Sequence, residues 1–460
     1  MTDPTLLDRP ARAVLAELVA NRLTPLDLLD AAEARVAARD GAVNALPTLC
    51  FDRARDRARA LMAAPASERG PLRGLPIAVK DLTDVAGVRT TYGSPIFADH
   101  VPERSDALVD RIETRGGVVF AKSNTPEFGA GASTFNEVFG ITRNPHDPAL
   151  SVAGSSGGSA AALAGGMAWL ATGSDLGGSL RTPASFCGVV GLRPTPGRVG
   201  AAPRANPFDD LSVEGPMARD VGDLGLLLDA MAGAAEADPL GFDTPPGLFA
   251  EAALRPKARL RVAVTPDAGI TPLDPAVRAA FDAAVARLAA AGVEIDDRPL
   301  DYAGAGAAFQ TLRAIGFATN MAPLLERHRD RLKPEVVWNI EAGLKLGAEE
   351  IAAARRTRVR LLQTTLARLA EVDAILCPAA CVPPFAAEMR YPERCDGRGF
   401  ENYIDWLRIV FVWSLQSVPA LALPAGRFPG GAPFGIQAVG RPRGEAALLS
   451  VGAALEAALA

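Results

Sequence analysis

Short apolar segments alternate with longer helical patterns along almost the whole 460-residue chain. Runs that predict buried strands lie at residues 75–80, 118–121, 260–264, 293–295, 372–376, 420–423 and 436–439. Patterns that predict helices start at Pro25, after the N-cap residue Thr24, and recur at 52–62, 106–115, 277–291, 305–370 and 445–459. This alternation is typical of an α/β fold with a mixed sheet.

The domain organisation follows from length and composition. A chain of 460 residues corresponds to about three domains of ordinary size, but large α/β enzymes often form one unit. The sequence has no internal repeat and no long linker. Apolar residues make up 49% and charged residues 22% of it, which excludes extensive disorder. We expect a single domain over residues 1–460.

Charge and hydropathy exclude several classes of partner. The formal net charge of −5 gives no basic surface for nucleic acid. The longest apolar run, residues 160–171, is too short to span a bilayer. The first 18 residues are interrupted by charges and do not form a signal peptide. We expect a cytoplasmic protein that binds neither nucleic acid nor a membrane.

Metal ligands are scarce in the sequence. The five cysteines are scattered, and the one close pair, Cys377 and Cys381, has no second pair with which to build a zinc site. None of the three histidines belongs to an H-x-x-H or H-E-x-x-H motif. We expect buried reduced thiols, and chemistry without a metal or other cofactor.

Lysine is used sparingly: it accounts for five of the 48 basic residues. Arginine does not lose its proton in a protein, whereas a buried lysine can. Each lysine is therefore a candidate for a special role. Lys80 stands out because it ends the apolar run at residues 75–80.

Two Gly/Ser-rich segments interrupt the apolar pattern, residues 154–159 (GSSGGS) and 173–181 (GSDLGGSLR). Dense apolar elements on both sides argue against a flexible linker. Two such turns, each leading into a helix, direct several backbone N–H groups to one point, as is needed to hold a phosphate or an oxyanion.

Two known motifs also have to be considered for the glycine-containing segments of this chain. Residues 116–123 resemble a P-loop but have Ala121 in place of its second glycine. Residues 154–158 match G-x-S-x-G, the nucleophile elbow, which would make Ser156 the nucleophile. That hypothesis needs a downstream histidine, and only His328 is available, on what is predicted to be a solvated helix face.

Taken together, these segments resemble the amidase signature family. The resemblance rests on the run at 74–81 (GLPIAVKD), the two Gly/Ser loops, and the continuation of the second loop to Gly188 (RTPASFCG). Further landmarks extend it over most of the chain, at residues 124–129, 139–145, 213–219 and 424–426. The sequence departs from the family pattern mildly, with Ala153, Ser174 and Arg193 where Gly, Thr and Lys are common.

The resemblance implies an amidase signature fold, with a central mixed β-sheet covered by helices on both faces. It implies a signature core over about residues 70–220 and a helical substrate-pocket region over about 300–370. The site residues that it implies are Ser179 as nucleophile, Ser155 as bridging serine after a cis peptide, Lys80 as base, the amides of Leu176, Gly177, Gly178 and Ser179 as oxyanion hole, Asp175 and Arg181 as supports, and Gly129 and Gly131 near the substrate.

The chemistry of the residues agrees with these roles. A serine hydroxyl is a weak nucleophile until a base takes its proton. Lysine acts as a base at neutral pH when burial lowers its pKa, and Asp81 would oppose that shift if it pointed toward Lys80. A second serine can accept one proton while giving up another, which extends the reach of the lysine.

We therefore predict an amidase that hydrolyses neutral apolar or aryl amides, anilides or carbamates through an acyl-enzyme. Aromatic residues near the end of the chain (Tyr403, Trp406, Phe411, Trp413) are candidates for the apolar wall of its pocket, and equally for the core. The alternative is the glutaminase subunit of a tRNA-dependent amidotransferase, against which Thr182 argues, since glutamine is usual there. A non-catalytic relative is disfavoured because all three triad positions are filled. The sequence does not predict the oligomeric state.

Overall fold

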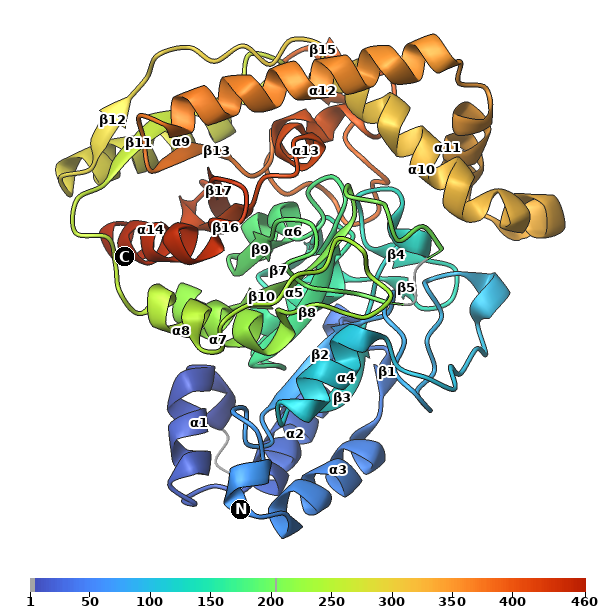
Figure 1. Ribbon diagram of the computed structural model, residues 1–460, viewed down its shortest axis with the longest axis vertical. Helices are drawn as coiled ribbons and strands as arrows, with labels where there is room; N and C mark the ends of the chain where they lie inside the picture. Colours follow the sequence, from blue (N-terminus) through green and yellow to red (C-terminus); the bar gives the residue numbers. More distant parts are fainter. Residues whose placement is uncertain (1–4, 203–204) are drawn as a thin grey trace.

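The computed structural model describes residues 5–202 and 205–460, and a large mixed sheet lies at its centre (Figure 1). Its 11 strands are β1 (Thr48–Leu49), β2 (Pro76–Lys80), β3 (Val118–Ser123), β8 (Leu170–Asp175), β9 (Val190–Arg193), β10 (Val213–Ala218), β11 (Arg261–Val264), β12 (Glu294–Asp296), β13 (Ala374–Pro378), β16 (Ala420–Arg427) and β17 (Pro433–Val439). Their order across the sheet is β1-β3-β2-β8-β10-β9-β16-β17-β13-β11-β12.

The sheet combines parallel and antiparallel pairs. Strand β2 runs parallel to β3 and β8 near one end of the sheet, and β11 runs parallel to β12 and β13 at the other. The strands between them, from β8 to β13, pair antiparallel. This confirms the α/β class and the mixed sheet predicted from the alternating pattern.

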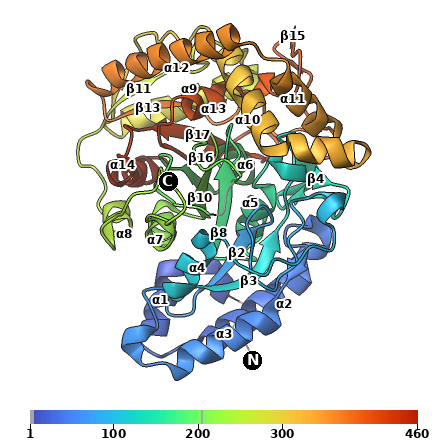
Figure 2. The same cartoon turned by 45° about the vertical axis from the view of Figure 1, so that its right-hand side comes forward.

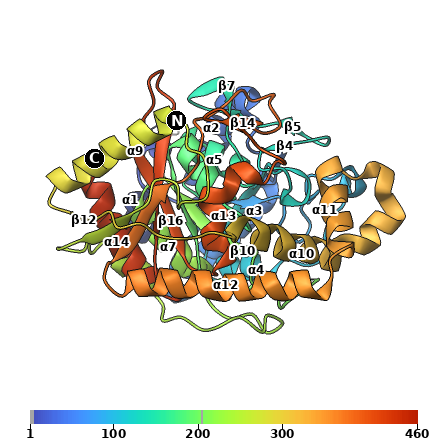
Figure 3. The ribbon, with the colours of Figure 1, turned by 90° about the horizontal axis from the view of Figure 1, so that it is seen from above.

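Helices cover both faces of the sheet. They are α1 (Ala11–Val19), α2 (Pro25–Val43), α3 (Phe51–Ala63), α4 (Ala107–Thr114), α5 (Gly157–Ala164), α6 (Arg181–Cys187), α7 (Val221–Met231), α8 (Leu248–Ala253), α9 (Pro275–Ala290), α10 (Ala305–His328), α11 (Pro334–Leu344), α12 (Ala348–Leu369), α13 (Arg408–Leu415) and α14 (Glu445–Ala458). Seen from above, α9 and α12 lie on opposite sides of the strands between them (Figure 3). The N-terminal helices α1–α3 lie at the opposite end of the molecule from α10–α12 (Figure 2).

Smaller elements complete the fold. The pairs β4 (Phe135–Asn136) with β5 (Gly140–Ile141), β6 (Arg143–Asn144) with β7 (Asp147–Ser151), and β14 (Arg394–Cys395) with β15 (Arg398–Gly399) form separate two-stranded sheets. One of them, β4–β5, follows the loop at residues 128–132, which borders the site described below.

Local sequence sets the helix boundaries that matter most. The Thr24 side chain accepts a hydrogen bond from the Asp27 amide (3.2 Å), and the Asp27 carboxylate accepts one from the Thr24 amide (2.8 Å). This capping box, with Pro25 in the first helical turn, confirms the predicted start of α2. The predicted helical stretch 305–370 divides into α10, α11 and α12, because Pro334 starts α11 and Gly347 caps α12.

The strands that carry the Gly/Ser loops are buried on both faces. Every residue of β2, β3 and β8 is buried, as is typical of strands covered by helices on both sides. Helix α5 packs on β8, and α6 packs on β16 and β17. Both loops therefore lie inside the molecule, beside the end of β2.

Candidate active site

Lys80 lies at the end of β2 with its side chain fully buried. Its Nζ lies within hydrogen-bond distance of three serine hydroxyls, at 2.7 Å from Ser155 Oγ and 2.9 Å from both Ser156 Oγ and Ser174 Oγ. Among the described residues, no carboxylate lies within ion-pair distance of this ammonium group. Lys80 is thus a buried lysine whose partners are all neutral.

Burial lowers the pKa of Lys80 to about 7, although the more distant charges of Glu214 and Asp175 oppose this shift. Asp81 points away from Lys80. Its carboxylate lies 3.3 Å from Lys122 Nζ and accepts a hydrogen bond from Thr91 Oγ1 (2.6 Å). Because of this orientation, Asp81 does not oppose the lowering of the Lys80 pKa, as it would if it pointed toward Lys80.

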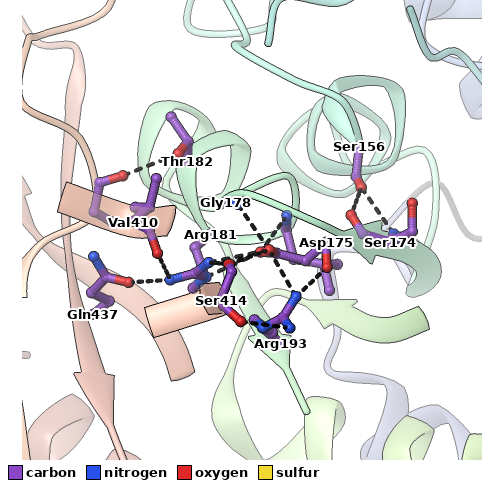
Figure 4. A network of polar contacts seen from close by, with 12 residues as sticks. Ser156, Ser174, Asp175, Gly178, Arg181, Thr182, Arg193, Val410, Ser414 and Gln437 are labelled. Carbon is purple, nitrogen blue, oxygen red and sulfur yellow. Dashed lines mark hydrogen bonds and ion pairs between the residues drawn. The ribbon is translucent and has the colours of Figure 1, made fainter. Parts of the chain in front are cut away.

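The two Gly/Ser loops are tied to each other. The peptide bond between Gly154 and Ser155 is cis, as the resemblance implies. The Ser156 hydroxyl donates to the Ser174 carbonyl and accepts from the Ser174 amide, both at 3.2 Å (Figure 4). The Ser156 amide donates to the Ser179 carbonyl (3.1 Å). Gly173 permits this approach, because a Cβ there would lie 2.7 Å from Ser156 Oγ.

Asp175, at the end of β8, holds the second loop through a buried network (Figure 4). Its carboxylate accepts hydrogen bonds from the amides of Gly178 (2.8 Å) and Leu180 (3.2 Å) and from Arg181 Nε (3.0 Å). Arg193, on β9, adds a second cation 3.4 Å away. Burial alone would raise the pKa of Asp175, but the charges of Arg181 and Arg193 outweigh burial and hold it well below its usual range.

Arg181 extends this network to the C-terminal part of the chain. Its guanidinium donates to the Val410 carbonyl (2.8 Å), Gln437 Oε1 (2.7 Å) and Ser414 Oγ (2.7 Å). The predicted supporting positions of Asp175 and Arg181 thus lie directly behind the loop. In the sequence Arg193 stands out only as a departure from the family pattern, and the structure makes it part of this network.

The predicted oxyanion-hole residues fall into two groups. Leu176, Gly177 and Ser179 line a cavity, whereas the Gly178 amide, expected as a fourth donor, instead donates to Asp175. Gly178 has a φ of +116°, and a Cβ there would lie 2.4 Å from Val410 Cγ2. Glycine is therefore required at 178 by backbone conformation and by packing.

The cavity encloses about 160 Å³ and contains Ser155, Ser174 and Ser179 in its wall. Gly129 and Gly131, predicted to lie near the substrate, line it as well. The rest of the wall is mainly apolar and comes largely from α10 and the loop at residues 128–132. Its other lining residues are Leu82, Phe128, Ala132, Leu176, Gly177, Asp209, Leu211, Ser212, Phe309, Leu312, Arg313, Gly316, Phe317, Asn320, Met321, Tyr403 and Leu407.

The family model for amidases matches residues 27–449. The chain belongs to the amidase family. An acylamidase of Rhodococcus erythropolis is 32% identical over 99% of this chain and 97% of its own length. A glutamyl-tRNA(Gln) amidotransferase subunit of Koribacter versatilis is also 32% identical, over 93% of each chain.

Solved structures share the fold of this amidase. The crystal structure of a bacterial aryl acylamidase of the amidase signature family has a TM-score of 0.90 at 23% identity, over 98% of this chain and 96% of that one. The expected amidase signature fold is confirmed. Family and relatives together make this protein a hydrolase that acts on amides.

Only one of the four predicted aromatic wall residues lines the cavity of this amidase. Tyr403 does, whereas Trp406, Phe411 and Trp413 are fully buried in the core. Phe411 acts one layer behind the wall, because its ring stacks on that of Phe309 at 4.1 Å. Phe411 and Trp413 lie on α13, of which every residue except Arg408 is buried, so the sequence pattern of this helix does not distinguish the cavity from the core.

Of the residues singled out by the two alternative motifs, only Ser156 lies at the site. Residues 118–123 of the P-loop-like stretch form strand β3, and Lys122 is ion-paired with Asp81. His328 ends α10 and does not line the cavity. Ser156 Oγ lies within hydrogen-bond distance of Lys80 Nζ.

The remaining sequence expectations concern cysteines, metals and membranes. All five cysteines are free; four are buried and Cys50 is half-buried. Within residues 5–202 and 205–460, no three His, Cys, Asp or Glu side chains are grouped so as to hold a metal ion. In the same part of the chain, no helix combines the length and apolar character needed to cross a membrane.

Proposed function

We propose that this amidase cleaves amides through an acyl-enzyme on Ser179, with Ser155 as proton relay and Lys80 as base. The observation that carries the proposal is the buried Lys80 side chain, whose Nζ has neutral partners only and lies 2.7 Å from Ser155 Oγ. Ser155 lines the same cavity as Ser179. A lysine whose pKa is about 7 is neutral in a large fraction of molecules at physiological pH, as a base must be.

The proposed reaction has two halves. Neutral Lys80 takes the proton of the Ser155 hydroxyl while Ser155 takes that of Ser179, and Ser179 Oγ attacks the amide carbonyl carbon. The amides of Gly177 and Ser179, with Leu176 beside them, stabilise the oxyanion. As the C–N bond breaks, the proton returns from Lys80 through Ser155 to the leaving amine. Water then attacks the acyl-enzyme by the same relay and releases the acid.

The substrate class follows from the wall of the cavity. Phe128, Phe309, Phe317 and Met321 supply apolar and aromatic surface next to Ser179. We therefore propose amides with an apolar or aryl part, including anilides, and carbamates as a related class. The name of the similar acylamidase supports this choice. We further propose that residues 1–460 act as one domain, with the catalytic core at about 70–220 and the pocket helices at about 300–370.

The second candidate is a glutaminase component of an amidotransferase, favoured by the 32% identity to the Koribacter versatilis protein. Assaying the purified chain with glutamine and with a 4-nitroanilide separates the two. Turnover of the anilide without turnover of glutamine supports the amidase. The reverse result supports the glutaminase.

The acyl-enzyme is tested by partitioning. An amide and an ester with the same acyl group pass through one intermediate, so added hydroxylamine should give the same ratio of hydroxamate to acid from both. Direct attack by water would make the ratio depend on the leaving group. Intact mass after quenching should show an acyl adduct that is absent from Ser179→Ala, and mapping of the adduct to Ser156 would contradict the proposed nucleophile.

A further inference from the structure

Arg313 is a buried cation in the wall of the proposed substrate cavity. It lies on α10, one helical turn beyond Phe309, and only 6% of it is exposed. Its guanidinium lies 4.4 Å from the ring centroid of Phe317 and 5.4 Å from that of Tyr403. Cation–π contacts of this kind offset part of the cost of burying a charge.

The hydrogen-bond partners of Arg313 are neutral. Its guanidinium donates to Asn339 Oδ1 and to the Tyr403 hydroxyl (2.5 Å). A guanidinium has five N–H donors, so these two bonds do not exhaust it. Within residues 5–202 and 205–460, no carboxylate lies at ion-pair distance from it.

The other buried arginines differ in this respect. Arg181 and Arg193 pair with Asp175, and Arg198 pairs with Glu445 at 2.8 Å. A buried charge is costly unless it is paired, and these three follow that rule. Arg313, of the buried arginines in the described part of the chain, is the exception, and it is the one that faces a cavity.

Two acidic residues on elements near Arg313 are paired with other arginines. Glu335 on α11 pairs with Arg390 (2.6 Å), and Asp405 pairs with Arg408 (2.8 Å). Asp209 also lines the cavity, where it borders a neighbouring depression, and its carboxylate accepts a hydrogen bond from the Leu211 amide (2.9 Å). The position opposite Arg313 is therefore open to an anion from outside the chain.

We propose that Arg313 binds a carboxylate of the substrate, so that this enzyme acts on amides that carry an acidic group. A planar carboxylate matches the fork of a guanidinium, and a small group suits a cavity of about 160 Å³. This inference rests on the proposed function and replaces the wholly neutral substrate expected from the sequence.

Two matched pairs of chromogenic amides test it, one for each side of the scissile bond. On the acyl side, succinyl-4-nitroanilide is compared with 4-methylpentanoyl-4-nitroanilide, in which an isopropyl group replaces the carboxylate. On the amine side, the acetyl amide of 3-carboxy-4-nitroaniline is compared with acetyl-4-nitroanilide. In at least one of the two pairs, the wild-type kcat/KM for the carboxylate member should exceed that for the neutral member by about 10- to 100-fold.

Substitutions assign the preference to Arg313. Arg313→Met should abolish the preference, measured as the ratio of kcat/KM between the two members of a pair, and Arg313→Lys should keep part of it. Arg327→Met is the matched control, because Arg327 is exposed on the same helix, and it should keep the full preference. An equal loss for both members of a pair in Arg313→Met would overturn the inference.

The comparison of carboxylate and neutral substrates with the wild-type enzyme tests the inference even if Arg313→Met does not fold. Hydrolysis of the neutral members as fast as the carboxylate members in both pairs overturns the role of Arg313 and leaves the proposed function standing. No hydrolysis of any of the four compounds contradicts the proposed function, and this inference with it.

Discussion

Two buried lysines on neighbouring strands show how one partner changes the chemistry of a residue. Lys122 on β3 is paired with Asp81, whereas Lys80 on β2 has hydroxyl partners only. Because a carboxylate favours the charged form of a lysine, Lys122 is suited to a structural role. Lys80, with no such partner, is suited to accept a proton near neutral pH.

At this scale, Lys80→Arg and Lys80→Met should each lower kcat by about 10²- to 10⁴-fold, because neither residue acts as a base. The exposed Lys345→Arg is the control and should retain full activity. Steady-state kinetics with a 4-nitroanilide measure the effect. Near-wild-type turnover by Lys80→Arg would show that the charge of Lys80, and not its basicity, is needed.

The pH dependence of kcat/KM should follow the same residue. Below a pH of about 7, Lys80 is protonated and cannot accept a proton, so kcat/KM should fall about tenfold per pH unit. Above it, kcat/KM should reach a plateau as Lys80 becomes neutral. A profile recorded from about pH 5 to 9 checks this, and a flat profile would exclude Lys80 as the base.

Ser179 and Ser155 should differ in how much activity is lost when each is substituted. Ser179→Ala removes the proposed nucleophile and should reduce turnover to background. Ser155→Ala should cost less, because a water molecule can take the place of a relay hydroxyl. The comparison of the two kcat values is the measurement. Equal activity of Ser179→Ala and the wild type would reject the assignment of the nucleophile.

At the scale of elements, the loop between β8 and α6 is held by charge. Asp175 joins the end of β8, the loop amides and two arginines from α6 and β9. Its replacement leaves both guanidinium groups buried without an anion, since Arg181 is fully buried, as is Arg193. The shape of this loop thus depends on an ion-pair network whose members, Asp175, Arg181 and Arg193, do not line the cavity.

Asp175→Asn should therefore lower the free energy of unfolding by about 3–5 kcal/mol, the usual cost of breaking a buried ion pair by removing one partner. Glu349→Gln is the control, because it breaks the exposed pair of Glu349 with Arg356 and should cost at most about 1 kcal/mol. Urea titration followed by circular dichroism compares the two variants. Equal losses would show that the network contributes no more than a surface pair.

At the scale of the whole molecule, the cavity is assembled from distant segments. The Gly/Ser loops contribute the serines, α10 contributes Phe309 and Phe317, and the segment before α13 contributes Tyr403. In Figure 1, α10 and α11 extend from the sheet beside the green elements that carry the loops. In the proposed mechanism, the bond-breaking residues thus come from the N-terminal half of the chain, while much of the apolar wall comes from α10 in the C-terminal half.

The assembled site should work without a metal ion. Dialysis against EDTA should leave kcat and KM unchanged. In the proposed mechanism backbone amides stabilise the oxyanion and Lys80 accepts the proton, so no step needs a metal ion. The assay is repeated after addition of Zn²⁺ or Mg²⁺. Loss of activity in EDTA that Zn²⁺ restores would contradict the mechanism.

Local sequence determined the elements and their ends. The capping residues Thr24 and Asp27 and the apolar run that becomes β2 act on neighbours a few residues away. Such short-range effects are readable because capping geometry and backbone conformation depend on adjacent residues. The family motif added the order of the site residues along the chain.

Only the tertiary structure decided which side chains contact one another. The contacts of Lys80 with Ser155 and Ser174 join residues 75 and 94 positions apart, and those of Arg181 with Gln437 span 256 positions. Tyr403 and Trp406 lie in a turn and a short 3-10 helix without a repeating polar face, so their sequence left open that Trp406 belongs to the core and Tyr403 to the cavity. The unpaired charge of Arg313 is likewise a property of the folded surroundings, because pairing depends on which carboxylates the packing brings within reach.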